Sequence, residues 1–141
     1  MFDTLKADFD RYFELLPPHY GRWERFIFFL TCPGQWALLD YRARKWMPAR
    51  PRWFRLIMMW PMFFFHIWIN VFTGIELQTG ATIGKGFYIG HFGGIFVHPD
   101  CVIGEHCAIS QGVTLGLGGK GKYHGAPQLG KDVYVGAGAK I

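Results

Sequence analysis

The sequence has few cysteines, and none of them forms a recognisable motif. Its 141 residues include three, and no two of them make a CxxC pair. An odd number without such a pair argues against a disulfide framework and favours reduced thiols. The chain also lacks the basic start of a secretory signal, because Asp3 and Asp8 stand there instead. We therefore expect a cytoplasmic protein.

Glycine is scarce in the first 73 residues, and tryptophan is absent after Trp68. All six tryptophans lie between Trp23 and Trp68, whereas only three of the 19 glycines precede Gly80. Half of the residues are hydrophobic and 18% are aromatic, with the aromatics concentrated in the first half. This contrast predicts two regions, a helical, aromatic and basic one over 1–73 and a glycine-rich one over 74–141.

Acidic residues are sparse where basic ones gather. The net charge of +5 comes mostly from residues 1–73, with ten Lys and Arg against six Asp and Glu. The densest basic run contains no acid and comprises Arg42, Arg44, Lys45, Arg50, Arg52 and Arg55. Beside a continuous apolar run, such a cluster favours an anionic membrane surface over nucleic acid. We expect a peripheral membrane contact through 42–72, at the inner face of the cytoplasmic membrane, and no nucleic acid.

Apolar runs as long as a typical membrane-spanning helix are also missing. Apolar residues at helical spacing predict a helix over 2–16, ended by Pro17 and Pro18. Two apolar runs follow, at 26–39, interrupted at 32–34, and at 56–72. A spanning helix needs roughly 20 apolar residues, and Pro61 should break or kink the second run. Three interpretations stay open: a buried helical subdomain that packs on the β-helix or on neighbouring subunits, a monotopic or re-entrant membrane attachment, and a single membrane span.

The second half has a six-residue repeat of aliphatic residues. They fall at Ile83, Ile89, Val97, Ile103, Ile109, Leu115, Leu129, Val135 and Ile141. Six of the eight intervals are six residues long, and a small residue follows most of these positions. One such unit makes a short strand and a turn, and three units close one coil that stacks on the next. The repeat predicts a parallel β-helix of hexapeptide repeats after the helical region, an α+β chain.

Two intervals interrupt the repeat and are expected to form loops on the binding face. The first is eight residues long and contains His91, and the second is fourteen residues long and rich in Gly and Lys. The second loop is suited to approach a phosphorylated ligand. The repeat reaches Ile141 in the middle of a coil, and we expect further coils beyond it.

Residues 76–141 resemble serine acetyltransferases, in particular at 109–116 (ISQGVTLG) and 135–141 (VGAGAKI). The resemblance implies left-handed winding, a homotrimer, and acetyl-CoA bound in the groove between two subunits. It implies that His91 is a general base for an acceptor hydroxyl and that Glu76, fifteen residues earlier, orients the imidazole. The positions that match the acetyl-CoA contacts are Leu117, Gly118, Gly119, Lys120 and Ala137.

The chain departs from that family where the amino-acid substrate is held. The family's aspartate before the histidine is Gly90 here, and its Arg-His pair before a proline is Gly125-Ala126. The pattern is similar to the serine-acetyltransferase-like enzymes of polysaccharide biosynthesis. We therefore expect an O-acetyltransferase acting on a sugar or polysaccharide precursor, with Tyr123 and His124 contacting the acceptor.

Three alternatives remain beside this interpretation. The first is serine O-acetyltransferase of cysteine biosynthesis, and the second is a β-helix scaffold without activity. The third is a zinc site between subunits, as in γ-type carbonic anhydrases. His91, His98 and His106 are seven and eight residues apart and out of phase with one another. No metal is therefore expected.

Overall fold

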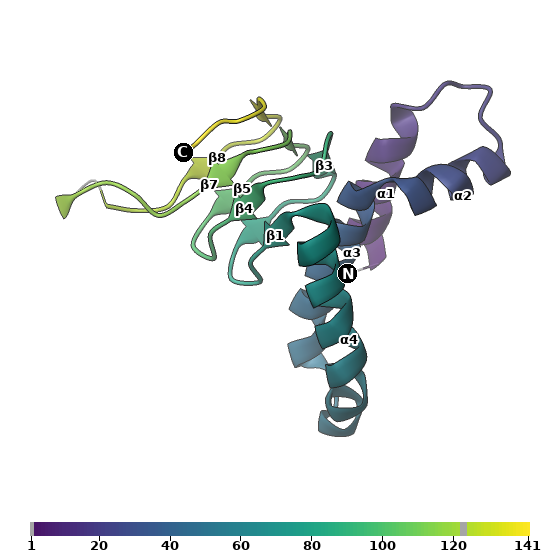
Figure 1. Cartoon of the computed structure of the whole chain (residues 1–141), viewed down its shortest axis with the longest axis horizontal. Coiled ribbons are helices and arrows are strands. Elements are labelled where there is room, and N and C mark those ends of the chain that lie inside the picture. The colour runs from purple at the N-terminus through teal and green to yellow at the C-terminus, as the bar shows by residue number, and fades with distance from the viewer. Residues whose placement is uncertain (1, 122–123) are drawn as a thin grey trace.

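The computed structural model describes residues 2–121 and 124–141, in which helices come first and short parallel strands follow (Figure 1). The helices are α1 (Phe2–Glu14), α2 (Arg22–Thr31), α3 (Pro33–Trp46), the 3-10 turn η1 (Met47–Ala49) and α4 (Arg52–Thr73). The order of helices and strands confirms the predicted class in its coarse form.

The strands are two or three residues long and return to the same side of a coil after every third strand. They are β1 (Ile75–Leu77), β2 (Thr82–Ile83), β3 (Tyr88–Ile89), β4 (Ile95–Val97), β5 (Val102–Ile103), β6 (Ala108–Ile109), β7 (Thr114–Leu115), β8 (Gln128–Leu129) and β9 (Tyr134–Val135). They form three parallel sheets, ordered β1-β4-β7, β2-β5-β8 and β3-β6-β9. The described strands thus build a three-sided stack of coils, as the six-residue repeat predicts.

The two interruptions of the repeat leave the register intact. Phe96 pairs with Thr114, eighteen residues on, which is three six-residue units. Ile75 pairs with Ile95, twenty residues on, because the bend at His91 adds two residues. Val102 pairs with Gln128, twenty-six residues on, because the second loop adds eight. Both insertions therefore lie outside the stacked strands, and the second projects from them (Figure 1).

A column of buried side chains fills the coils. The aliphatic residues of the repeat from Ile83 to Leu115 are all at most 5% exposed. Cys101 and Cys107 are also buried, which confirms the inward positions expected for them. Stacking identical positions brings each side chain onto its counterpart one coil away, so the column excludes water along its length.

One corner of the stack needs glycine. Gly74, Gly94, Gly112 and Gly138 have φ angles between +63° and +75°, where L side chains are disfavoured. A Cβ at Gly112 would lie 3.4 Å from the Cα of Gly138, and one at Gly94 would lie 3.6 Å from the Cα of Gly112. This corner therefore lets the bend that contains His91 lie directly on the coil above.

A buried ion pair attaches the first helix to the coils. The Arg42 guanidinium donates to both carboxylate oxygens of Asp8, at 2.9 and 3.3 Å, and to the carbonyls of Ile83 and Gly84 at 2.6 Å. Asp8 in turn accepts from the backbone N–H of Phe87 at 3.0 Å. Arg42 therefore does not belong to a basic surface, and the expected cluster is smaller than its sequence suggests.

Helix α4 is long and projects away from the coils (Figure 1). It continues through Pro61 without a break, contrary to expectation. Pro61 is exposed, so the carbonyl that its missing N–H leaves free need not be buried. Within the described residues, α4 alone is long and apolar enough to cross a membrane, and only 11% of its most apolar stretch is buried. Within one chain this helix is therefore largely uncovered, and its packing on neighbouring subunits or on a membrane stays a prediction.

Candidate active site

His91 lies in the bend between β3 and β4, at the first interruption of the repeat. Its side chain is exposed rather than packed in the aliphatic column. Together with Gly90 and Phe92 it lines a cavity of about 170 Å³. The imidazole is thus accessible to a small acceptor, as a general base must be.

The opposite wall of this cavity comes from the helices. It is formed by Phe28 and Thr31 at the end of α2 and by Cys32, Pro33 and Gly34 at the start of α3. Gly34 must be glycine, because a Cβ there would lie 2.5 Å from the Tyr12 hydroxyl and 2.9 Å from the Ile89 carbonyl. The sequence did not predict this wall, because its only sign there is the interruption of the apolar run at 32–34.

Tyr12 holds the strand that leads into His91. Its hydroxyl donates to the carbonyl of Ile89 at 3.3 Å and accepts from the N–H of the same residue at 2.9 Å. Burial raises the pKa of Tyr12 well above its usual value, so the phenol stays protonated and keeps both bonds. Helix α1 therefore fixes the position of β3 and of the bend that follows it.

Cys32 contributes a half-buried thiol to the cavity wall. Burial raises the pKa of Cys32 above its usual value of 9.0, although the backbone N–H groups of Gly34 and Gln35 oppose that change. A thiol that stays protonated at neutral pH is a poor attacking group. The other titratable side chain that lines the cavity is that of His91.

Glu76 lies in the middle of β1, half-buried and opposite Phe96. Its carboxylate accepts a hydrogen bond from the side-chain amide of Gln78. The structure describes both Glu76 and His91, and no hydrogen bond or ion pair joins them. The bend still packs on the start of β1, because the N–H of Ile95 donates to the carbonyl of Gly74 at 2.9 Å. The partnership of the two residues remains a prediction.

The positions expected to contact acetyl-CoA lie around β7. Leu117, Gly118, Gly119 and Lys120 are exposed and follow β7, and Gly118 forms an antiparallel bridge with Gly125. Ala137 is exposed in the last coil, next to Gly138, whose N–H donates to Gln111 just before β7. Residues 117–120 thus lie after the end of β7, whereas Ala137 lies near its start.

Of the two residues expected to contact the acceptor, His124 is described by the structure and does not line the His91 cavity. His124 is exposed, in the second loop, with its N–H donating to the carbonyl of Gly121 at 3.1 Å. Tyr123 lies outside the described residues. Among the residues that the structure does describe, no group of three or more His, Cys, Asp or Glu side chains is placed to hold a metal.

Comparison with curated proteins finds serine acetyltransferases along the whole chain. The serine acetyltransferase of Synechococcus elongatus is 38% identical over 143 residues, covering 100% of this chain and 54% of the relative. That of Bacillus subtilis is 35% identical over 142 residues, covering 99% and 60%. No protein-family model matches the chain. The chain spans a little over half the length of these relatives.

Solved structures agree in fold. A serine acetyltransferase from Vibrio cholerae superposes with a TM-score of 0.72 at 27% identity, covering 99% of this chain and 51% of that one. One from Brucella abortus, solved in complex with coenzyme A, gives a TM-score of 0.74 at 24% identity, covering 99% and 52%. A Brucella melitensis structure described as a hexapeptide-repeat serine O-acetyltransferase gives 0.72 at 23% identity. The likeness includes the helices as well as the coils.

These findings correct the expected acceptor. The departures at Gly90 and at Gly125-Ala126 led to a sugar or polysaccharide precursor, yet relatives that match the helices and the coils together are serine acetyltransferases. The missing charged residues show only that contacts to serine are lost at these two places, and they do not identify another acceptor. The expectation of a sugar was therefore wrong. The chain is similar, over its whole length, to serine acetyltransferases.

Proposed function

We propose that this protein is an acetyl-CoA-dependent O-acetyltransferase whose acceptor is the hydroxyl of serine. The observation that carries the proposal is the exposed His91 in a cavity of about 170 Å³. Pockets for drug-sized ligands are usually about 300 Å³ or larger, so this one suits a small amino acid. The curated relatives from Synechococcus elongatus and Bacillus subtilis, both named serine acetyltransferases, support the same acceptor.

The chemistry that we propose is direct transfer. His91 takes the proton of the serine hydroxyl as the oxygen attacks the thioester carbonyl of acetyl-CoA. The tetrahedral intermediate collapses with cleavage of the carbon–sulfur bond. The imidazolium returns its proton to the departing thiolate, so that O-acetylserine and free coenzyme A are formed and His91 is regenerated.

In this proposal Glu76 is a positioning residue. A carboxylate beside a histidine fixes its tautomer and stabilises the imidazolium that forms during transfer. What supports the assignment is the packing of the His91 bend on the strand that begins one residue before Glu76. The amide of Gln78, which now occupies the carboxylate, has to release it for this role.

For the co-substrate, the proposal keeps the exposed loop after β7 and the exposed Ala137. The backbone of Gly118 and Gly119 would lie along the pantetheine arm, and Lys120 would meet the phosphates as a cation. A structural neighbour solved with coenzyme A has the same fold. No metal takes part in the proposed reaction.

The finer features of the fold and assembly belong to the proposal. We propose that the coils wind left-handed, that three chains assemble, and that the acetyl-CoA groove lies between two of them. We place the protein in the cytoplasm, at the inner face of the cytoplasmic membrane. Three free cysteines suit that reducing setting, and the exposed apolar surface of α4 suits the membrane contact.

The test is an assay of the 141-residue chain with acetyl-CoA and L-serine. We expect release of free coenzyme A thiol that depends on serine, together with a product heavier than serine by one acetyl group. A parallel series with a panel of sugars is expected to give only the background rate. Thiol release that requires a sugar, or that ignores serine, would overturn the proposal.

A further inference from the structure

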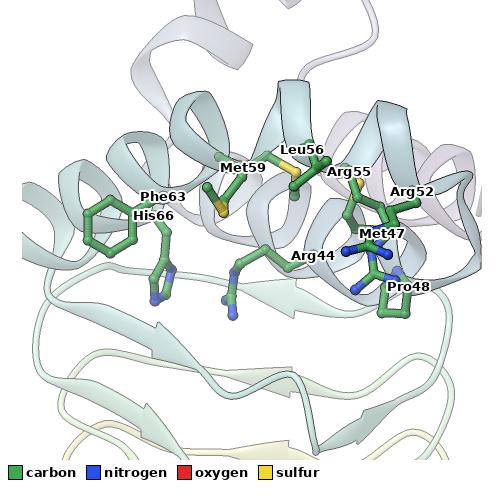
Figure 2. A pocket seen from close by; sticks show the side chains of 10 residues that line it. Arg44, Met47, Pro48, Arg52, Arg55, Leu56, Met59, Phe63 and His66 are labelled. Atoms are coloured by element: carbon green, nitrogen blue, oxygen red, sulfur yellow. The ribbon is translucent and has the colours of Figure 1, made fainter.

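A large cavity lies beside α4, outside the coils' aliphatic column and unused by the proposed reaction. Its volume is about 590 Å³, and it is lined by residues of α3, η1 and α4. Its rim contains Arg44, Arg52 and Arg55, whereas Leu56, Met59 and Phe63 make it apolar (Figure 2). Cations above an apolar surface match an amphiphilic anion rather than a free ion.

The arginines of the rim are not equivalent. Arg44 donates to Asp40 at 2.8 Å and to the carbonyl of Leu77 at 2.8 Å, so its charge is already countered. Arg52 and Arg55 are exposed, and among the described residues no carboxylate lies within ion-pair distance of either. These two guanidinium groups therefore have donors to offer to a ligand.

His66 closes the cavity but is already satisfied. Its Nδ1 lies 2.9 Å from Asp40, and its Nε2 lies 3.0 Å from the amide nitrogen of Asn70. Both ring nitrogens are thus engaged within the protein. A phosphate in this cavity would be held by Arg52 and Arg55, and not by the imidazole.

The surface next to this cavity is aromatic and uncovered. On α4, Trp53, Trp60 and Phe64 are each about 60% exposed. The chain from position 41 to position 73 contains no Asp or Glu. A second copy of the chain would have to bring carboxylates to this face to neutralise it, whereas an anionic bilayer supplies both the negative charge and the apolar interior.

We infer that the cavity between η1 and α4 binds the phosphate head group of an anionic lipid, with Arg52 and Arg55 as its ligands and α4 lying in the membrane interface. The acyl part lies along Met59 and Phe63, and Trp53 and Trp60 reach the level of the head groups. The inference deepens the proposed membrane contact and rests on it, but not on the acetyl transfer.

The experiment measures binding of the 141-residue chain to vesicles by co-sedimentation. Vesicles of phosphatidylcholine alone are compared with vesicles that contain phosphatidylglycerol. The double variant Arg52→Gln/Arg55→Gln is compared with Lys85→Gln/Lys131→Gln, which removes the same charge from exposed positions on the coils. All four substituted residues are exposed, so folding should be retained, and circular dichroism checks this.

We expect binding that needs phosphatidylglycerol and falls with salt. Loss of the two cavity arginines should weaken it about thirtyfold, since each basic residue near such a surface contributes about a factor of five. The lysine variant should stay within about twofold of the parent. Trp60→Ser should also weaken binding, because an exposed tryptophan anchors in the interface.

Other outcomes would overturn the inference in distinguishable ways. Equal losses in the arginine and lysine variants would reject the cavity and leave a membrane contact of some other kind. No binding to either vesicle would reject the cavity and the membrane contact together. An oligomer in the absence of vesicles that dissociates in Trp60→Ser would show that a second copy covers this face. None of these results bears on serine-dependent thiol release.

Discussion

His91 is recognisable in the sequence because it interrupts a regular pattern. A residue at a break in a six-residue repeat has to leave the stack, and the structure places its side chain on the surface beside a small cavity. The other wall of that cavity was not predictable. Thr31 and Cys32 are about sixty residues away in the sequence, and the packing of α3 on β3 brings them there.

The proposed dependence of His91 on Glu76 has a specific signature. Glu76→Gln alone should lower kcat with serine roughly tenfold to a hundredfold, because the imidazolium loses its partner. In the His91→Ala background the same change should cost nothing more, since residues that act as a unit are not additive. Steady-state kinetics on the four proteins measures this. Independent, multiplying losses would remove Glu76 from the proposed role.

Cys32 allows a chemical test of the cavity wall. Burial raises the pKa of its thiol above the usual 9.0, so at pH 7 it should react with a bulky maleimide more slowly than an unburied cysteine, and the rate should go on rising above pH 9.0. Once attached, the adduct fills the cavity and should abolish serine-dependent thiol release. Cys32→Ser should be insensitive to the reagent. Full activity of the labelled protein would show that the acceptor binds elsewhere.

At the scale of elements, the sequence pattern wrongly predicts that one buried arginine belongs to a basic surface. Arg42 stands in a basic run, but it lies against Asp8, which is 34 positions away, and only 8% of its side chain is exposed. The spacing of residues within one helix does not indicate a partner on another helix. The helix breaks at Pro17 and Cys32, by contrast, follow from local chemistry, and α1 ends before the first while α2 and α3 meet at the second.

Arg42→Met should destabilise the protein by about 3–5 kcal/mol, the usual cost of leaving one buried charge without its partner. The change also leaves the carbonyls of Ile83 and Gly84 without this donor. Urea denaturation measures the loss. The matched control is Lys6→Met, whose exposed pair with Asp10 should matter little. Equal stability of the two variants would contradict the anchoring role.

The same variant predicts a pH dependence. Burial raises the pKa of Asp8 above 3.8 in the folded protein, and the guanidinium of Arg42 opposes that change. Without Arg42 the folded pKa should rise further. A carboxyl whose pKa is raised by folding contributes its full stability below pH 3.8, where Asp8 is protonated in both the folded and the unfolded protein. That contribution is lost as the pH rises through the folded pKa. The destabilisation by Arg42→Met should therefore be smaller at pH 4 than at pH 7.

At the scale of the whole molecule, the coils were predictable and the acceptor was not. A column of aliphatic residues six apart dictates where each strand falls, and the observed register follows from the repeat and its two insertions. The packing of the helices on the coils follows from no such repeat. The contact between Tyr12 and Ile89, for example, joins residues 77 positions apart. The departures at Gly90 and Gly125 suggested a sugar, and relatives across the whole chain overturn it.

The proposed assembly predicts the mass of the particle. If the acetyl-CoA groove lies between two subunits, active protein should sediment at three times 16.2 kDa or a multiple of that mass. Analytical ultracentrifugation at the protein concentration of the assay measures this. A monomer with full serine-dependent activity would show that one chain suffices and would contradict the shared groove.

The most direct measurement of the central claim compares His91→Ala with His19→Ala, which removes an exposed histidine of the loop before α2. The account predicts that kcat/KM for serine, at saturating acetyl-CoA, falls about 10²- to 10⁴-fold in His91→Ala and stays at the parental value in His19→Ala, with both proteins folded. A His91→Ala variant that transfers acetyl groups to serine at the parental rate would contradict it.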